Sequence, residues 1–448
     1  VSPGAPKPET LLEVERRAGR GRALVVGSGP AGFFAADILE RAGFAVTLVE
    51  QGPPAPERLQ DISRFESGGP LREASNYAFG AGGAGTFSDG KLTSRTKRVS
   101  REREYVSARY VQYGAPEEIL WQAHPHIGSD RLYTLVQAGR EELQKRGVVF
   151  LFNTRIIDLI ISGGRCTGAR SAEAEFSADI TVLAPGHSAF SLFRTLMRRG
   201  ARFDSKGFAL GFRIEHPREL INRAQWGCSE IPGLKAAEYR LTAKAASGRG
   251  VYTFCMCPGG RVIPAAFKEG VNIVNGVSNY GRDGAFSNAA VVAAVRPEEI
   301  FPEAGSPAEI LGGLEDLEAR VFGLFGSHAV PGTVPEFLAS GRAPSGLPLS
   351  SHPFGVEACD YRQIFPGWLL EDLSDGLKDF SRRLRGFETG LILGVEATSS
   401  SVLQVQRTEA GECENIPGLY LAGEGSGSAG GIMSSAVDGI RTALAASR

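Results

Sequence analysis

Three glycines near the start of the chain have the spacing of a dinucleotide-binding loop. Gly27, Gly29 and Gly32 form GxGxxG between an apolar run and a helical pattern, and Glu50 ends the next apolar run. The first glycine permits a tight turn, the second lets backbone approach a pyrophosphate, and the third lets helix and strand pack closely. The helix N-terminus attracts phosphate, and the acidic residue can accept hydrogen bonds from ribose hydroxyls. The pattern predicts a bound dinucleotide.

Two cysteines are candidates for redox chemistry. Cys255 and Cys257 lie in a strand-like segment, where side chains two positions apart point to the same face. They could form a dithiol relay with a cofactor, although relay pairs generally have two or four intervening residues. The alternative is core packing, because free cysteines are often buried.

A glycine-rich segment, Gly68–Leu92, is too long for an ordinary connection and is therefore expected to be functional. Lys91 at its end could donate a hydrogen bond to a cofactor or bind a substrate carboxylate, or it could be structural. Ser88 and Asp89 could contact a cofactor or cap the turn.

Other polar residues suggest structural roles or a pocket lining. His124 and His126 form HxH with no third ligand nearby, so no metal site is predicted. Arg213 and Glu215 alternate with apolar residues on an expected strand and could form a buried ion pair, while His216 points to the other face.

The elements that would position the glycine loop follow the hydrophobic pattern. Ala23–Val26 and Ala45–Glu50 are expected strands around a helix at Gly29–Gly43, and Ile180–Ala184 is another buried strand. From about residue 201, strand-like stretches are separated by loops, and helical patterns occur at Pro307–Phe325 and Trp368–Leu384, as in a separate α+β domain. Near the C-terminus, Leu419–Ala422 and a helix from about Gly431 form a second strand–glycine–helix unit.

Composition sets limits on function. The 448 residues exceed one usual core, which favours two domains. A net charge of −1 argues against nucleic acid or an anionic membrane as the main partner. No apolar run approaches the ~20 residues of a membrane span, and six scattered cysteines fit a reducing cytoplasm. Glycine, at 58 residues, is about twice its usual ~7%.

Two later segments resemble the two-dinucleotide-fold flavoproteins. These are Ile180–His187 (ITVLAPGH) and Asn415–Gly439 (NIPGLYLAGEGSGSAGGIMSSAVDG). The resemblance implies FAD, with Glu424 binding the ribityl chain and the helix that opens at Gly430-Gly431-Ile432 directed at the flavin N1/O2 edge. A helix N-terminus would stabilise the negative charge that reduced flavin carries there.

Five further strings resemble the bacterial family of uncharacterised NAD(FAD)-utilising dehydrogenases, and the resemblance runs from about residue 22 to 445. They are FGAGGAGTFSDGKL (Phe79–Leu92), HPHIGSDRL (His124–Leu132), GFRIEHP (Gly211–Pro217), GRGVYTFCMCPGG (Gly248–Gly260) and GVEATSSSV (Gly394–Val402). Ala81 stands where the family has an acidic residue, and the run Glu396-Ala397-Thr398 lacks an arginine expected there. These departures suggest a specialised substrate.

We therefore predict an α/β protein with a Rossmann-type FAD-binding domain, built on a parallel sheet with a β-meander and interrupted by an α+β substrate domain. The expected parts are a flexible N-terminal arm (residues 1–20), the FAD-binding domain (21–200 and 391–448) and the substrate domain (201–390). The candidate catalytic residues are Lys91, Cys255 and Cys257. The candidate cofactor-binding residues are Gly27, Gly29, Ala31, Gly32, Glu50, Gln51, Gly82, Gly83, Thr86, Ser88, Gly186, Gly423, Glu424, Gly430, Gly431 and Ile432.

The expected function is that of a cytoplasmic FAD-dependent dehydrogenase that passes a hydride between a small organic substrate and flavin N5. FAD is expected to be non-covalent, because no histidine–cysteine anchor motif is evident. NAD(P)H would bind transiently, because the sequence has no second complete GxGxxG unit. Two alternatives are an NAD(P)H-using flavin monooxygenase and a flavin-binding scaffold or redox sensor. No oligomeric state follows from the sequence.

Overall fold

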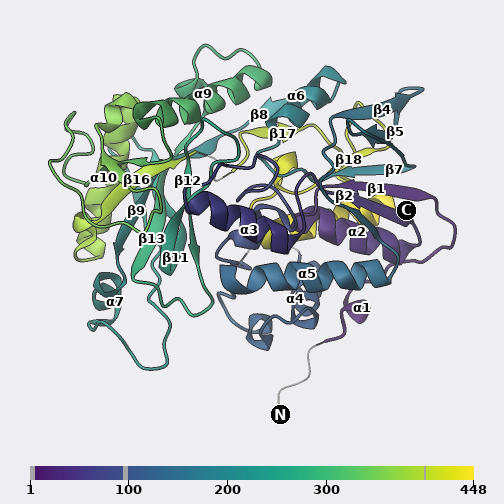
Figure 1. Cartoon of the computed structure of the whole chain (residues 1–448), viewed down its shortest axis with the longest axis horizontal. Helices are drawn as coiled ribbons and strands as arrows, with labels where there is room; N and C mark the ends of the chain where they lie inside the picture. The colour runs from purple at the N-terminus through teal and green to yellow at the C-terminus, as the bar shows by residue number, and fades with distance from the viewer. Residues whose placement is uncertain (1–5, 94–98, 398–399) are drawn as a thin grey trace. The chain divides into compact units, whose positions relative to one another are not determined.

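The computed structural model describes residues 6–93, 99–397 and 400–448 and divides the chain into two compact units (Figure 1). The first unit contains residues 1–62, 72–205 and 403–448, and the second contains residues 63–71 and 206–402. Thr398 and Ser399, which belong to one of the family-like strings, lie outside the described residues.

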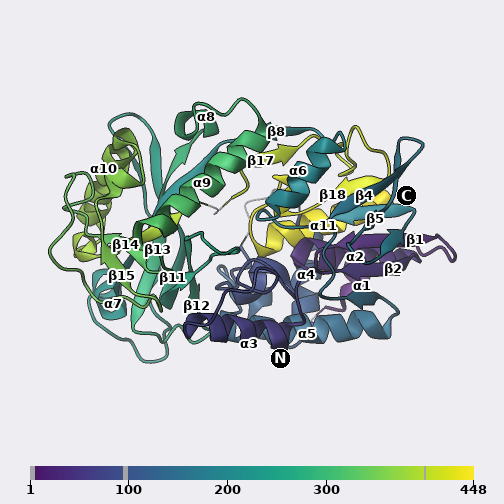
Figure 2. The same ribbon diagram turned by 45° about the horizontal axis from the view of Figure 1, so that its top comes forward.

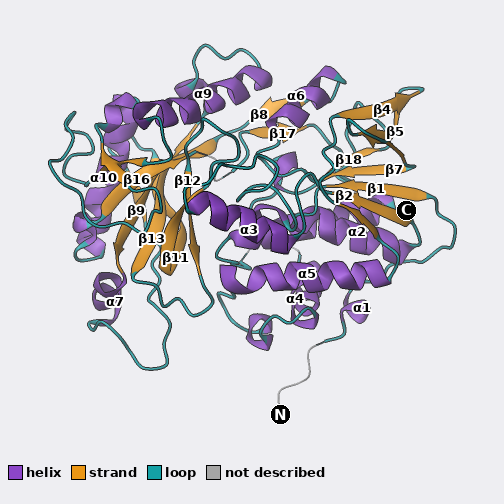
Figure 3. Ribbon diagram, in the orientation of Figure 1, coloured by secondary structure: helices purple, strands orange, loops and turns teal. Residues whose placement is uncertain are grey.

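The first unit is built on a five-stranded parallel sheet of order β18-β7-β1-β2-β3 (Figure 3). Its strands are Leu419–Leu421, Ile180–Leu183, Arg22–Val26, Ala45–Val49 and Val149–Leu151. Helices α2 (Pro30–Ala42) and α11 (Ile432–Ala446) lie side by side (Figure 2). They pack so closely that a Cβ on Gly439 would lie 2.0 Å from the carbonyl oxygen of Ala31.

The remaining elements of the first unit surround this sheet. An antiparallel β4-β5-β6 sheet is the predicted β-meander, so the structure confirms a Rossmann-type fold. These further elements are α1 (Pro8–Leu11), α3 (Ala55–Glu66, ending in the second unit), η1 (Gly83–Phe87), α4 (Ser100–Gln112), η2 (Glu117–Leu120), α5 (Ser129–Lys145), β4 (Asp158–Ser162), β5 (Arg165–Arg170), β6 (Glu175–Ser177), α6 (Phe190–Arg198), β8 (Phe203–Ser205), β17 (Leu403–Val405) and η5 (Glu424–Ser426).

The second unit is built on a large, mainly antiparallel sheet. Its order is β10-β11-β13-β9-β16-β14-β15, with β12 paired to β11. The strands are β9 (Phe208–Pro217), β10 (Thr242–Lys244), β11 (Gly250–Pro264), β12 (Val274–Ser278), β13 (Phe286–Val295), β14 (Val330–Thr333), β15 (Val356–Ala358) and β16 (Leu391–Glu396).

Helix α10 (Gly367–Arg383) covers one face of this sheet, because a Cβ on Gly376 would meet the side chain of Val251. The other helical elements of this unit are α7 (Arg218–Trp226), α8 (Pro297–Ile300), α9 (Pro307–Phe325), η3 (Tyr361–Gln363) and η4 (Phe387–Thr389). None of the helices in the described parts of the chain is long and apolar enough to cross a membrane.

Two details differ from the sequence expectation. Strand β16 was assigned to the FAD-binding domain, but it pairs with β9 and β14 and therefore belongs to the second unit. The arm predicted to be flexible contains the short helix α1, and Leu12 just after it is buried in the core of the first unit. Glu9 of α1 also forms an ion pair with Arg109 of α4 at 2.9 Å, so apolar and ionic contacts together hold this part of the arm.

Candidate functional site

The GxGxxG loop connects β1 to α2 and leaves room for a ligand at one glycine only. A Cβ on Gly27, at φ +99°, would lie 2.2 Å from the carbonyl oxygen of Ala184, and one on Gly32 would lie 1.9 Å from that of Gly27. At Gly29 the nearest atom is 3.7 Å away, and no side chain caps the helix that begins there. The N-terminus of α2 is therefore open to a phosphate, as a dinucleotide site requires.

Glu50 is buried, and both of its carboxylate oxygens accept hydrogen bonds from the protein. Oε2 accepts from the backbone N–H of Ser28 at 2.9 Å and from its hydroxyl at 2.7 Å. Oε1 accepts from the N–H of Gly52 at 3.0 Å and of Gly80 at 3.2 Å. A buried anion needs such donors. Besides the ribose contact predicted from sequence, Glu50 thus joins the GxGxxG loop to two other segments.

Arg58, a residue that sequence reasoning missed, organises the glycine segment next to this loop. Its side chain is fully buried. Its Nη1 donates to the carbonyl oxygens of Gly80, Ala81 and Gly83 at 3.2, 2.8 and 2.8 Å. Burial lowers the pKa of this guanidinium to about 10, although the charge of Glu50 opposes the shift. The only signal for Arg58 in the sequence is its position in the helix that follows Glu50.

The segment held by Arg58 lies against the GxGxxG loop. The N–H of Gly82 donates to the Ser28 hydroxyl at 3.1 Å, and a Cβ on Gly29 would lie 3.7 Å from Cα of Gly83. Three predicted cofactor-binding glycines are thus brought together. Thr86 donates to the carbonyl oxygen of Ala81 at 2.9 Å, so its hydroxyl supports the loop.

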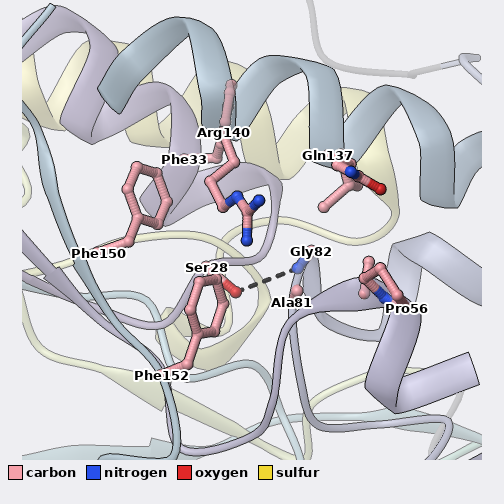
Figure 4. A pocket seen from close by; sticks show the side chains of 11 residues that line it. Ser28, Phe33, Pro56, Ala81, Gly82, Gln137, Arg140, Phe150 and Phe152 are labelled. Carbon is pink, nitrogen blue, oxygen red and sulfur yellow. Dashed lines mark hydrogen bonds between the residues drawn. The ribbon is translucent and has the colours of Figure 1, made fainter. Parts of the chain in front are cut away.

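A hollow that is partly open to solvent lies beside these loops (Figure 4). Arg140 of α5 lies over the ring of Phe152, 5.8 Å from its centroid. Aromatic rings, a guanidinium and nearby backbone amides suit a flat heteroaromatic group. The lining residues are Ser28, Phe33, Ala55, Pro56, Ala81, Gly82, Val136, Gln137, Arg140, Phe150 and Phe152.

A second open helix start follows β18. Gly431, at φ +84°, has no atom within 4 Å of an added Cβ, and no side chain caps α11 there. Gly430 would bring a Cβ to 3.8 Å from Oε1 of Glu424. Gly423 donates its N–H to Asp438 at 2.7 Å, which fixes the turn. Because β1, β7 and β18 are parallel neighbours, this site and the GxGxxG loop lie at one edge of one sheet.

His187 follows β7 and contacts Glu424 at this edge. Its Nδ1 lies 3.1 Å from Oε2 of Glu424. Burial lowers the pKa of His187, but the charge of Glu424 and the hydrogen bond outweigh burial and raise the pKa above its ordinary value. Gly186, next to His187, has φ +73° and open space around an added Cβ.

The structure gives the predicted residues Lys91 and Ser88 local partners. The ammonium of Lys91 forms an ion pair with Asp89, and the backbone of Lys91 pairs with that of His126. The Ser88 hydroxyl donates to the carbonyl oxygen of Gly85 at 2.8 Å and accepts from the N–H of Gly90 at 3.2 Å. Ser88 thus stabilises the turn, and the charge of Lys91 is already compensated.

The two cysteines do not occupy adjacent positions on one regular strand face, so this part of the prediction was wrong. A β-bulge interrupts β11, because three residue steps from Phe254 to Cys257 oppose two on β13. Cys255 has φ +43° and is partly exposed, while Cys257 is buried and its thiol lies 3.3 Å from the Cys255 carbonyl oxygen.

The suggested pairing of Arg213 with Glu215 was also wrong. Arg213 Nε donates to Glu396 on β16 at 3.0 Å, whereas Glu215 accepts from the N–H and hydroxyl of Ser351. A strand brought alongside β9 by the tertiary fold supplies the carboxylate that lies closer to the guanidinium.

Three further residues from the sequence analysis, Ala31, His124 and His126, differ in burial. Ala31 is buried under Gly423, whose added Cβ would lie 2.6 Å from that of Ala31. His124 is exposed and His126 is buried. Within the described ranges no group of three His, Cys, Asp or Glu side chains is arranged to hold a metal ion.

Comparisons with known proteins agree with a flavoprotein assignment. Residues 207–399 match the family described as "FAD-dependent protein, C-terminal domain-like". The chain is 37% identical over 431 residues to an uncharacterised protein of Clostridium beijerinckii, and the alignment covers 95% of this chain and 80% of the relative. The chain therefore belongs to the same family as this uncharacterised Clostridium protein.

Solved structures show more distant likeness. CtdE in complex with FAD is 10% identical, with a TM-score of 0.37 over 95% of this chain and 82% of that chain. A geranylgeranyl bacteriochlorophyll reductase-like protein of Thermoplasma acidophilum is 14% identical, with a TM-score of 0.40 over 95% and 78%. Glycine oxidase of Bacillus cereus is 12% identical, with a TM-score of 0.36 over 95% and 96%.

Proposed function

We propose that this protein is an FAD-dependent oxidoreductase of dehydrogenase type, in the manner of the NAD(FAD)-utilising dehydrogenases, that exchanges a hydride between a small organic substrate and flavin N5. One observation carries the proposal. Two helix N-termini without side-chain caps, those of α2 and α11, follow neighbouring parts of one parallel sheet. Together with Glu424 they provide two positive dipole ends and an acidic acceptor, which suit a diphosphate, a polyol chain and a ring that becomes negative on reduction.

Different residues at this edge of the sheet would bind different parts of FAD. Gly29 and the N-terminus of α2, with the amides of Gly82 and Gly83, would hold the diphosphate. The aromatic hollow around Phe150 and Phe152 would take the adenosine portion. Glu424 would accept from ribityl hydroxyls, and α11 would present its N-terminus to the ring. FAD, when bound, supplies the hydride acceptor or donor.

His187 and Glu424 would share one proton beside the ribityl chain of FAD. At neutral pH the raised pKa of His187 favours a proton on Nδ1, which His187 donates to the carboxylate of Glu424. This bond fixes the orientation of Glu424, leaving its other oxygen free to accept from a ligand hydroxyl. The second unit would contribute the substrate-binding surface, and NAD(P)H would serve only as a transient reductant.

The decisive experiment is an FAD titration of the apoprotein, followed by anaerobic visible spectra before and after NADH or NADPH. We expect a yellow protein, and E424A should weaken FAD binding at least about tenfold because a carboxylate accepting hydroxyl hydrogen bonds is worth 1.5 kcal/mol or more. E409A, which alters an exposed carboxylate of the same C-terminal segment, should bind FAD normally.

Two results would contradict the proposal. One is the lack of saturable FAD binding by a folded apoprotein, and the other is an unchanged affinity in E424A. Bleaching by NAD(P)H would indicate a reductase or monooxygenase direction, whereas a spectrum unchanged by both nucleotides would indicate that the reductant is the substrate itself.

A further inference from the structure

The turn that carries Glu424 is packed closely against backbone on two sides. Gly423, at φ +77°, would bring a Cβ to 2.6 Å from that of Ala31 on α2. Gly425 would bring one to 2.7 Å from the carbonyl oxygen of Gly186, which follows β7. This packing leaves the turn little room, so the contacts that hold the turn decide where the carboxylate of Glu424 lies.

A carboxylate of helix α11 holds one side of this turn. The N–H of Gly423 donates to Asp438 Oδ2 at 2.7 Å. Asp438 lies in the interior of α11, so the bond connects the turn directly to the helix whose N-terminus is open. A hydrogen bond to a charged acceptor is stronger than one between neutral groups. Any movement of α11 is therefore transmitted to the turn.

Arg407 binds both this carboxylate and the strand before the turn. Its Nη2 donates to Asp438 Oδ1 at 2.7 Å, and its Nη1 donates to the carbonyl oxygen of Leu421 at 2.5 Å. The side chains of Arg407 and Asp438 are only 12% and 19% exposed, so solvent screens their attraction little. The Arg407–Asp438 pair thus ties the end of β18, the turn and α11 to one another.

This ion pair differs from the contacts that hold the other end of the proposed cofactor site. There, Glu50 and Arg58 hold the GxGxxG loop and the glycine segment. The proposed site therefore has two halves with different supports. The α2 half includes Gly29 and Gly82, and the α11 half includes Glu424 and the N-terminus of α11.

We propose that Arg407 and Asp438 are positioning residues for the flavin end of FAD, and that they set the reduction potential of the bound flavin through the position of α11. This inference rests on the proposed function. The reduced ring carries negative charge, and a helix N-terminus stabilises that charge only when its backbone amides are fixed close to it. When the pair is broken, Glu424 and α11 lose their fixed relation, whereas the α2 half keeps its own contacts.

The test compares two ligands on the apoprotein, because FAD would use both halves and ADP only the α2 half. Calorimetry gives the dissociation constant of each ligand for wild type, D438N and R407Q. In both variants we expect the dissociation constant of FAD to rise at least about tenfold, because charge-assisted bonds are lost, and that of ADP to stay within about twofold. The reduction potential of the FAD-loaded variants should be more negative than that of wild type.

Three further variants serve as controls. R441Q removes a different ion pair of α11, to Glu102 of α4 at 2.7 Å, and should change neither dissociation constant nor the potential. R407K keeps a cation in place and should recover most of the FAD affinity that R407Q loses. R58M alters the support of the α2 half and should weaken ADP and FAD binding together.

Several results would overturn the inference. One is an unchanged FAD affinity or potential in folded D438N and R407Q, and another is an equal loss of ADP and FAD affinity, which would show that the pair only stabilises the unit as a whole. If D438N does not fold, R407Q and R407K decide the question, because a lysine that restores no affinity also contradicts the inference. Wild type without saturable FAD binding would overturn the proposed function as well, so the wild-type titration separates the two failures.

Discussion

At the residue scale, the site depends on buried charges that hold backbone in place. Glu50 accepts four hydrogen bonds from three segments, and Arg58 donates to carbonyl groups of the glycine segment. Neither arrangement places a catalytic group on a substrate. Both define where amides of the cofactor loops lie, which is the form of preorganisation that anion binding requires.

The residue-scale prediction is that R58M weakens FAD binding through loss of this support. The substitution removes the charged donor of these carbonyl groups, and a hydrogen bond from a charged donor is worth about 1.5–3 kcal/mol. We expect the free energy of unfolding to fall by about 2–4 kcal/mol and the FAD dissociation constant to rise at least about tenfold. Urea unfolding and FAD fluorescence titration measure the two effects. R64M, on an exposed position of the same helix, serves as the control, and equal behaviour of the two variants would refute this role.

At the element scale, helix α9 contains a buried acid with no compensating charge in contact. Glu318 is fully buried, and neither carboxylate oxygen has a hydrogen-bond partner among the described residues. Burial raises its pKa to about 8, and Lys268 offsets only part of this shift. Because the ordinary pKa is 4.5, the folded state binds a proton that the unfolded state releases between about pH 4.5 and 8, and stability falls across that range.

We therefore expect E318Q to be more stable than wild type at pH 8, with an advantage of a few kcal/mol since each pKa unit corresponds to about 1.4 kcal/mol. The advantage should shrink toward pH 5. Urea unfolding from pH 5 to pH 9 measures it. D316N, which alters an exposed acid on the same helix, should show no such trend. A pH-independent difference between E318Q and wild type would show that Glu318 ionises in the folded protein as it does in the unfolded chain.

At the scale of the whole molecule, the first unit is assembled from three separate stretches of chain. The residues proposed to bind the cofactor come from both ends of the chain, since Gly29 lies in the first stretch and Glu424 in the last. A ligand that binds both Gly29 and Glu424 must stabilise the packing of the first stretch against the last. Binding and folding of the first unit are therefore linked.

The corresponding prediction concerns thermal unfolding of the apoprotein. FAD at one hundred times its dissociation constant should stabilise the folded chain by about 2.7 kcal/mol, seen as a rise in Tm that increases with FAD concentration. Riboflavin lacks the diphosphate and the adenosine, so at the same concentration it should give a much smaller rise. Equal shifts with riboflavin and FAD would argue against the assigned diphosphate contacts.

The sequence by itself determined the local units of this fold. The strand–glycine–helix patterns at Gly27–Gly32 and near Gly431 follow from hydrophobic periodicity and from the spacing of the glycines, which are properties of neighbouring residues. Tertiary structure decided the partners across long separations. The choice of Glu396 for Arg213, the support of the glycine segment by Arg58 and the bulge at Cys255 depend on strand pairing and burial. No local pattern encodes these, because the energy of a buried polar group depends on which distant atoms the fold brings to it.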